Sequence, residues 1–156
     1  MHGLVFNGYD FSEVCQAQTV GVTPHRVRAE GVAIAGGIGA HMTGDGIDVR
    51  IVKVRLFLDA GCALTPEDAS RLRHRIDAML CAAQGATLQL PEDEVLKYRG
   101  AALTDGEGWT AMLEDGECTL TFTCYDPVAY GYERTTGEDA LKVGGTAETY
   151  PVFECV

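Results

Sequence analysis

The sequence lacks the segments that mark membrane and exported proteins. No apolar run approaches the roughly 20 residues that a helix needs to cross a bilayer. The first residues, MHGLVFNGYDF, contain no basic stretch followed by an apolar one, so no secretory signal is predicted and the chain is expected in the cytoplasm at synthesis. With 156 residues, 46% hydrophobic and 22% charged, the composition is typical of one globular domain with a sizeable core.

The motifs of the common catalytic and cofactor sites are also missing. The sequence contains no G-x-S-x-G and no H-E-x-x-H, and its four histidines have no partnered motif. The glycine-rich stretch 35–46 contains no lysine and precedes a predicted strand, whereas a phosphate-binding loop would precede a helix. We therefore predict no catalytic residue, no cofactor and no enzyme activity.

The six cysteines lack the spacing of a metal site. They stand at positions 15, 62, 81, 118, 124 and 155, without a C-x-x-C or C-x-x-H pair. Cys118 and Cys124 lie six residues apart on one predicted strand, about 20 Å at roughly 3.3 Å per residue, so they cannot form a disulfide bond with each other. We predict no metal site, and reduced cysteines that pack in the core.

Basic residues are scarce, above all in the second part of the chain. The 12 lysines and arginines face 23 acidic residues, for a net charge of −11. Residues 91–156 alone carry fourteen acidic and four basic side chains, a balance of −10. Nucleic-acid binders gain affinity by neutralising phosphates, so we predict no specific nucleic-acid binding. An acidic surface favours solubility.

The residues that are present predict an α+β fold. Asn7-Gly8, between apolar and aromatic residues, predicts a two-residue hairpin. One helix is predicted to begin after the N-cap Thr65, with Pro66 at its first position, and to stop at Gly85. Its apolar residues recur every three or four positions and form a stripe that faces a sheet. With the strands, this gives an antiparallel β-sandwich or split barrel with one packed α-helix. The other predicted strands cover residues 25–34, 47–59, 86–90, 95–103, 109–113, 117–125 and 149–156.

The strand predicted over residues 47–59 is the longest in the chain. Its apolar positions change parity between Ile51 and Val52, which predicts a β-bulge there. Arg50, Lys53 and Arg55 would then lie on its polar face.

The stretch 35–46, AGGIGAHMTGDG, predicts a long hairpin loop or a protruding arm, because it holds five glycines and has no apolar periodicity. It has too few apolar side chains to pack on its own domain, so we expect a neighbouring protomer to order it and to cover the edge of the strand that follows. The alternative is a surface hairpin without a partner. The predicted oligomer interface consists of Gly36, Gly37, Ile38, Gly39, His41, Met42, Asp45, Ile47 and Val49.

A strand followed by an aromatic turn occupies the segment LTFTCYDPVAYG. Its alternation places Phe122 and Cys124 together on the buried face. Asp126 and Pro127 end the strand, because proline cannot donate to a ladder and the aspartate can accept from the turn backbone. Tyr130 completes the motif.

The order of these elements resembles the N-terminal domain of siphophage distal tail proteins, the family called Dit. The resemblance covers nearly the whole chain and rests mainly on LTFTCYDPVAYG and the preceding DEVLKYRGAAL. It implies that residues 1–146 form a ring-forming tail domain and that residues 147–156 begin a linker or a second, galectin-like domain that is missing here. It also implies a structural protein, a hexameric ring or hub at the tail tip that joins the tail tube to the host-recognition apparatus.

The same resemblance implies the partners: further copies of this chain, the tail tube protein, the tape-measure protein and the tail-associated host-recognition protein, with no role for a membrane. It places the protein in the virion tail of a phage or prophage, and in the cytoplasm of the bacterial host during assembly. One alternative is a monomeric β-sandwich that binds a carbohydrate or another ligand through Tyr125, Tyr130 and Tyr132. Another is a thiol enzyme, which needs a perturbed cysteine beside a histidine.

Overall fold

The computed structural model of the protein describes residues 3–44, 46–58, 65–133 and 145. The predicted strand 149–156, the predicted domain boundary after residue 146 and Asp45 lie outside these residues. The helices are η1 (Phe11–Glu13), α1 (Pro66–Leu80) and α2 (Met112–Asp115). The strands are β1 (Val5–Phe6), β2 (Tyr9–Asp10), β3 (Gln16–Val22), β4 (Gly31–Ala33), β5 (Ala40–Met42), β6 (Arg50–Phe57), β7 (Ala86–Gln89), β8 (Lys97–Glu107), β9 (Glu117–Cys124) and β10 (Ala129–Tyr130).

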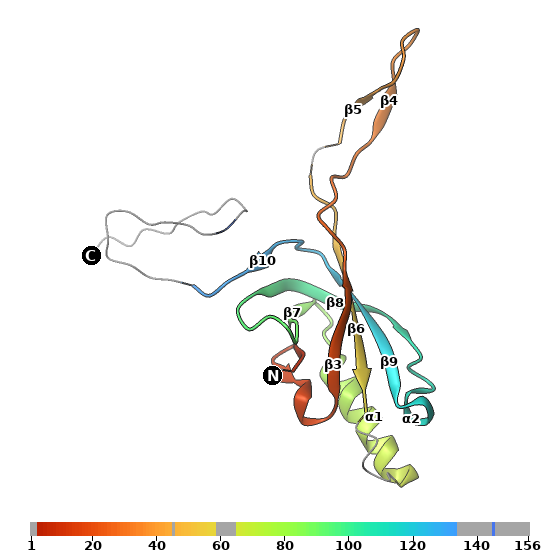
Figure 1. Ribbon diagram of the computed structural model, residues 1–156, viewed down its shortest axis with the longest axis vertical. Coiled ribbons are helices and arrows are strands. Elements are labelled where there is room, and N and C mark those ends of the chain that lie inside the picture. The colour runs from red at the N-terminus through yellow and green to blue at the C-terminus, as the bar shows by residue number, and fades with distance from the viewer. Residues whose placement is uncertain (1–2, 45, 59–64, 134–144, 146–156) are drawn as a thin grey trace, which may run out of the picture.

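The body of the domain is one antiparallel sheet covered by α1. Its strand order is β2-β1-β7-β8-β9-β6-β3, and β10 pairs with β8. Strands β4 and β5 form a separate two-stranded ribbon that projects from the body at the end away from α1 and α2 (Figure 1). The α+β fold class predicted from the sequence is confirmed.

The sheet curls around a single core. Strands β7 and β8 separate β1 from β9, so a flat sheet would hold these two strands about 14 Å apart. Yet the ring centroids of Phe6 on β1 and Phe122 on β9 are 5.0 Å apart. The two halves of the sheet therefore bend toward each other, as in a split barrel, and α1 adds Ile76, Met79 and Leu80 to the same core.

The N-terminal hairpin and the start of α1 follow the sequence prediction. Asn7 and Gly8 have φ values of 53° and 80°, the left-handed conformation that a type I′ turn requires. Thr65 caps α1 by accepting a hydrogen bond from the Asp68 amide. The helix ends at Leu80, five residues before the predicted stop at Gly85. A turn from residue 82 to Gly85 then leads the chain into β7.

Two details of the predicted strands are wrong. Strand β6 pairs with β9 residue for residue, so β6 has no bulge between Ile51 and Val52, and the irregularity lies in the neighbouring β3. The parity changes because Ile51 is half-buried on the opposite face. Arg50 lies on the core face, where it donates a hydrogen bond to the Tyr98 hydroxyl at 3.1 Å, and only Lys53 and Arg55 occupy the polar face.

The strand predicted over residues 109–113 is instead a loop that contains the short helix α2. Gly108 and Gly116, with φ values of 77° and 75°, turn the chain at either side of it. The segment between them is rich in helix formers, and its Met112 is fully buried in the core. The residues from Ala111 to Glu114 all have high helix propensity, so one helical turn forms here instead of a strand.

Strand β9 has the predicted faces. Leu120, Phe122 and Cys124 are fully buried, and the threonines between them are half-buried. The prediction of core cysteines is confirmed for Cys15, Cys118 and Cys124, which are free and buried. It is wrong for Cys81, which follows the last residue of α1 and is exposed.

We expect Cys124→Ser to lower the free energy of unfolding by about 1 to 3 kcal/mol, because a polar hydroxyl would replace a fully buried thiol on the core face of β9. Cys81→Ser is the matched control, and we expect it to leave the stability unchanged. Urea unfolding followed by circular dichroism measures both. Equal stability of the two variants would contradict the register of β9.

Candidate assembly surface

The arm predicted over residues 35–46 is present and begins earlier than the sequence suggested (Figure 1). Backbone hydrogen bonds join the outgoing and returning segments of the arm. Near the base the Asp48 amide donates to the Arg26 carbonyl, and further out the Thr43 amide donates to the Glu30 carbonyl, both at 2.8 Å. Strands β4 and β5 continue the ladder toward the tip. The region predicted as a body strand over residues 25–34 is therefore one side of the arm.

Glycines shape the tip of the arm. The Ile34 amide donates to the Gly39 carbonyl at 3.4 Å, and the Gly37 amide turns back to the Ile34 carbonyl at 3.1 Å. Gly36 and Gly39 have φ values of 74° and 103°, which side chains rarely tolerate. Ile38 lies at the end of the arm and is fully exposed to solvent. The tip thus presents one large apolar residue on a glycine frame.

The arm and the strand that leads into it are rich in exposed apolar side chains. Eight of the thirteen large hydrophobic residues that are exposed in the described part of the chain fall between positions 20 and 47. They are Val20, Val22, Val27, Val32, Ile34, Ile38, Met42 and Ile47. Apolar surface concentrated in this way is typical of interaction sites in soluble proteins.

Both faces of the arm are apolar. Val32 lies opposite His41, so these two share one face with Ile34, whereas Ala33 lies opposite Ala40 on the other face. None of the described hydrophobic residues from position 18 to position 51 belongs to the core or packs on it. Neither face of the arm is therefore covered by its own domain, and burial of the apolar side chains requires another molecule.

The base of the arm is fixed to the sheet. Thr23 donates its amide to the Ile51 carbonyl and accepts the Ile51 amide on its hydroxyl, both at 2.9 Å. Further out, Val27 bridges Ile47. The expectation that the strand after the arm has an open edge is wrong, because β6 pairs with both β3 and β9. The edge strand at this end of the sheet is β3.

The Glu92 carboxylate links the loop after β7 to β3 by two hydrogen bonds. The Thr19 amide donates to Glu92 Oε1 at 3.0 Å, and the Thr19 hydroxyl donates to Glu92 Oε2. Partial burial raises the pKa of Glu92, but the hydrogen bonds from Thr19 and from the Glu92 backbone together outweigh it and hold the pKa below its usual value. The charged carboxylate thus closes part of the gap between the two ends of the curled sheet and steadies the strand that carries the arm.

The structure distributes the predicted interface residues along the whole arm. Gly36, Gly37, Ile38 and Gly39 form the tip, His41 and Met42 lie in β5, and Ile47 and Val49 lie near the base. Asp45 lies outside the described residues. The predicted set leaves out five exposed apolar residues, because spacing of this kind also occurs in ordinary half-buried strands. They are Val20, Val22, Val27, Val32 and Ile34.

The aromatic turn after β9 separates β9 from β10, and both of these strands pair with β8. Asp126 accepts the Val128 amide at 3.1 Å and the Tyr130 hydroxyl at 2.8 Å, and Pro127 lies between them. The chain then resumes as β10 and pairs again with β8, the neighbour of β9. The hydrogen bond to Asp126 is the main cause that raises the pKa of Tyr130. Of the five motif residues, Phe122 and Cys124 serve the core, and the other three form this turn.

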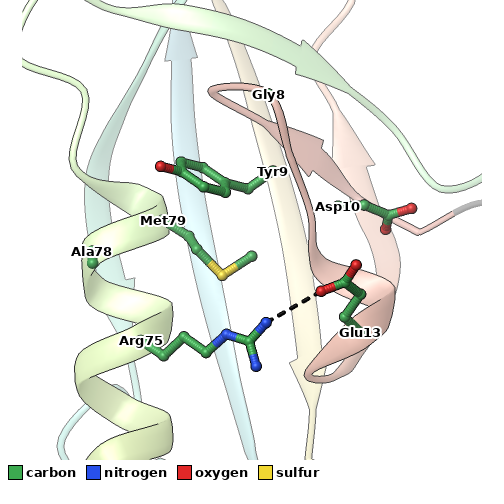
Figure 2. A pocket seen from close by; sticks show the side chains of 7 residues that line it. All are labelled: Gly8, Tyr9, Asp10, Glu13, Arg75, Ala78 and Met79. Carbon is green, nitrogen blue, oxygen red and sulfur yellow. Dashed lines mark hydrogen bonds and ion pairs between the residues drawn. The ribbon is translucent and has the colours of Figure 1, made fainter.

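A cavity of about 420 Å³ opens between the N-terminal hairpin and α1. Figure 2 shows Tyr9 near Met79 at one side, and the Arg75 guanidinium reaching across to Glu13. The distance from Arg75 Nη2 to Glu13 Oε2 is 3.2 Å, and Asp10 accepts the Ser12 amide. The charged groups of this cavity thus have hydrogen-bond or ion-pair partners in the same chain.

The buried thiols have the wrong electrostatics for nucleophilic chemistry. Burial raises the pKa of Cys15 to about 12, and those of Cys118 and Cys124 to about 11, so all three remain protonated near neutral pH. In the described part of the chain no three histidine, cysteine or acidic side chains gather to hold a metal ion. No helix there has the length and apolarity to span a bilayer.

Comparison with known proteins supports the architecture. A scan against protein-family models and a search of curated proteins give no match. Among solved structures, the chain matches SPP1 Dit (gp 19.1), described as a paradigm of the hub adsorption apparatus in phages that infect Gram-positive bacteria, with a TM-score of 0.68 and 19% sequence identity. The match covers 87% of this chain and 54% of SPP1 Dit, so this chain spans about half the length of that protein. The chain therefore has a Dit-like fold.

Proposed function

We propose that this chain is a structural protein of a phage or prophage tail, which forms a hexameric ring, or hub, at the tail tip. The ring joins the tail tube to the host-recognition apparatus, and residues 1–146 are its ring-forming domain. One observation carries the proposal: on a Dit-like fold, a long arm exposes apolar side chains on both faces and its own domain covers neither. Such an arm gains stability only when another molecule buries it.

The geometry of the arm favours a head-to-tail contact. The arm and the body of the domain are different surfaces, so an arm that binds the next body leaves that neighbour's arm available for a third copy. Contacts of this kind close into a ring when the rotation between copies allows it. Six copies follow from the resemblance to distal tail proteins.

The proposed partners are those of a tail-tip hub. They are further copies of this chain, the tail tube protein, the tape-measure protein and the tail-associated host-recognition protein. The proposed location is the virion tail, preceded by the cytoplasm of the bacterial host during assembly. Neither nucleic-acid recognition nor catalysis has a part in this role.

The mass of the purified chain in solution tests the proposal. We expect light scattering and native mass spectrometry to give six chains of 16.7 kDa, hence about 100 kDa, without any added ligand. The measurement needs a range of protein concentrations, because assembly shifts with concentration by mass action. A chain that stays monomeric over the whole range would overturn the ring.

A second candidate is a monomeric module that binds carbohydrate. Tyr125 and Tyr132 favour it, because these residues are 64% and 63% exposed and exposed aromatic faces stack on sugars. The same samples separate the two functions. A monomer whose chemical shifts change when glycans are added supports the binding module. An oligomer whose chemical shifts do not change supports the hub.

A further inference from the structure

A cationic groove of about 340 Å³ lies on the face of the sheet that points away from the core. In β7 and β8, Leu88 and Tyr98 are buried, so their neighbours in sequence point to the opposite face. This face collects Gln89, Lys97 and Arg99, together with Tyr130 of β10. Strands β1, β7, β8 and β10 all contribute to the groove.

The two cations in this groove are held over aromatic rings. The Arg99 guanidinium lies 4.4 Å from the ring centroid of Tyr130, and Lys97 Nζ lies 5.9 Å from that of Tyr132. The hydroxyl of Tyr130 is bonded to Asp126, which fixes the ring beneath the guanidinium. Neither cation forms an ion pair with any residue that the structure describes. Their charges are therefore positioned and available to an anion.

The opposite end of the same strands is strongly acidic. From residue 100 to residue 133 the sequence contains no lysine or arginine. The end of β8, helix α2 and the start of β9 expose five carboxylates, and none of them has an ion-pair partner in the described part of the chain. They belong to Asp105, Glu107, Glu114, Asp115 and Glu117. This acidic end lies far from the arm (Figure 1).

One copy cannot join its own groove to its own acidic end. Arg99 and Glu107 stand eight residues apart on β8, about 26 Å at roughly 3.3 Å per residue. Because β8 holds the groove and the acidic end apart, the groove of one molecule can contact only the acidic end of another molecule. Each copy also carries a net charge of −11, so copies repel one another unless local attraction brings them together.

We propose that the cationic groove of one copy binds the acidic end of a second copy. The inference rests on the self-association proposed above and adds a second contact besides the arm. The planar guanidinium of Arg99 suits a carboxylate of the incoming α2, and Lys97 neutralises a second one. The groove and the acidic end are different surfaces, so this contact is head-to-tail, as is the arm contact.

Reciprocal charge reversal tests the contact. The groove variant carries Lys97→Glu and Arg99→Glu, and the end variant carries Glu114→Lys and Asp115→Lys. We expect each variant alone to self-associate at least about tenfold more weakly than the parent, because like charges now face each other. Mixed in equal amounts, each variant offers the surface that the other needs, so we expect parental association with the two variants alternating in native mass spectra.

Three controls sharpen the result. Lys53→Glu with Arg55→Glu makes the same charge change on β6, outside the groove, and we expect it to associate like the parent. Lys97→Gln with Arg99→Gln removes the charges without reversing them and should lie between the parent and the groove variant. Raising the ionic strength from about 0.1 to 1 M shortens the Debye length from about 10 to 3 Å and should weaken the parental contact. Circular dichroism confirms that each variant is folded.

The outcomes separate this contact from the ring itself. A parental hexamer whose groove variant is also a full hexamer, or a mixture that fails to restore association, overturns the groove contact and leaves the hub proposal standing. Restored association of the mixture supports both. A parent that is monomeric at every concentration overturns both. If glycans shift the signals of the groove residues and the charge reversals leave self-association unchanged, the groove is a sugar site and not a contact between copies.

Discussion

Replacement of residues 33–40 by Asn-Gly should convert the assembled protein into folded monomers. The eight residues removed include Ile34 and Ile38, the apolar side chains at the tip of the arm. None of them contacts the core, so the body of the domain loses no packing. Light scattering reports the loss of assembly, and circular dichroism with thermal unfolding reports the intact body.

The backbone hydrogen bonds of the arm determine which residues the Asn-Gly turn should replace. The bonds from Thr43 to Glu30 and from Ile34 to Gly39 enclose β4 and β5 and make Val32 and His41 a hydrogen-bonded pair. A type I′ turn is closed by such a pair, and Asn-Gly is its preferred sequence. The shortened arm therefore keeps an unstrained end, which the native Asn7-Gly8 turn already uses in this chain.

A second variant, Ile34→Ser with Ile38→Ser, keeps the length and the glycines of the arm and removes only its apolar tip. Burial of one isoleucine contributes about 1.5 to 3 kcal/mol, so the loss of two should cost roughly 3 to 6 kcal/mol per contact. The dissociation constant would rise by a factor of about 10² to 10⁴. A matched change of an exposed aromatic off the arm, Tyr125→Ser, should leave assembly as it is.

The two variants together decide whether the arm assembles the protein. If the shortened arm leaves the oligomer intact, the tip of the arm is not the interface, and the contact lies on the rest of the arm or on the body of the domain. If the shortened arm dissociates the protein but the serine variant does not, then backbone pairing of β4 or β5 with a neighbour makes the contact, and the isoleucine side chains do not. Monomers in both cases assign the contact to the apolar tip.

Local signals in the sequence were enough for the parts of the fold that depend on neighbouring residues. The turn at Asn7-Gly8 needs two residues with positive φ, and the start of α1 needs Thr65 with Asp68 three positions later. The faces of β9 follow from strict alternation between apolar residues and threonine. Each of these features is decided within about ten residues, so one sequence contains the whole signal.

Features that depend on distant pairing could not be derived in this way. The apolar residues from Val20 to Ile34 have the spacing of a body strand, and only the absence of a covering partner makes them an arm. The hydrogen bonds between Thr19 and Glu92 join positions 73 residues apart. The cationic groove draws on four strands whose order no local pattern reveals. The glycine-rich composition of residues 35–46 still indicated a long hairpin loop or arm, and its first glycines form the tip.

Phe122→Ala should cause the largest loss of stability that we predict for a single substitution. Phe122 is fully buried in β9, and truncation of a core phenylalanine costs about 3 to 5 kcal/mol. For a chain of this length, that loss lowers the melting temperature by roughly 6 to 20 °C. Tyr125→Ala, three residues further along and exposed, is the control and should change the stability by less than about 0.5 kcal/mol. The arm-shortened monomer is the right background, because dissociation of an oligomer would otherwise add to the measured free energy.

The partner of Phe122 makes this substitution a test of the curled sheet. Phe6 and Phe122 lie on strands that β7 and β8 separate, yet their rings are tilted by 50° with centroids 5.0 Å apart. Aromatic pairs in this geometry interact by about 0.5 to 1.5 kcal/mol beyond the area they bury. In a double-mutant cycle, Phe6→Ala with Phe122→Ala should therefore cost less than the sum of the two single substitutions by at least that amount. Strict additivity would mean that the rings do not touch, and the sheet would then be flatter than the split barrel described above.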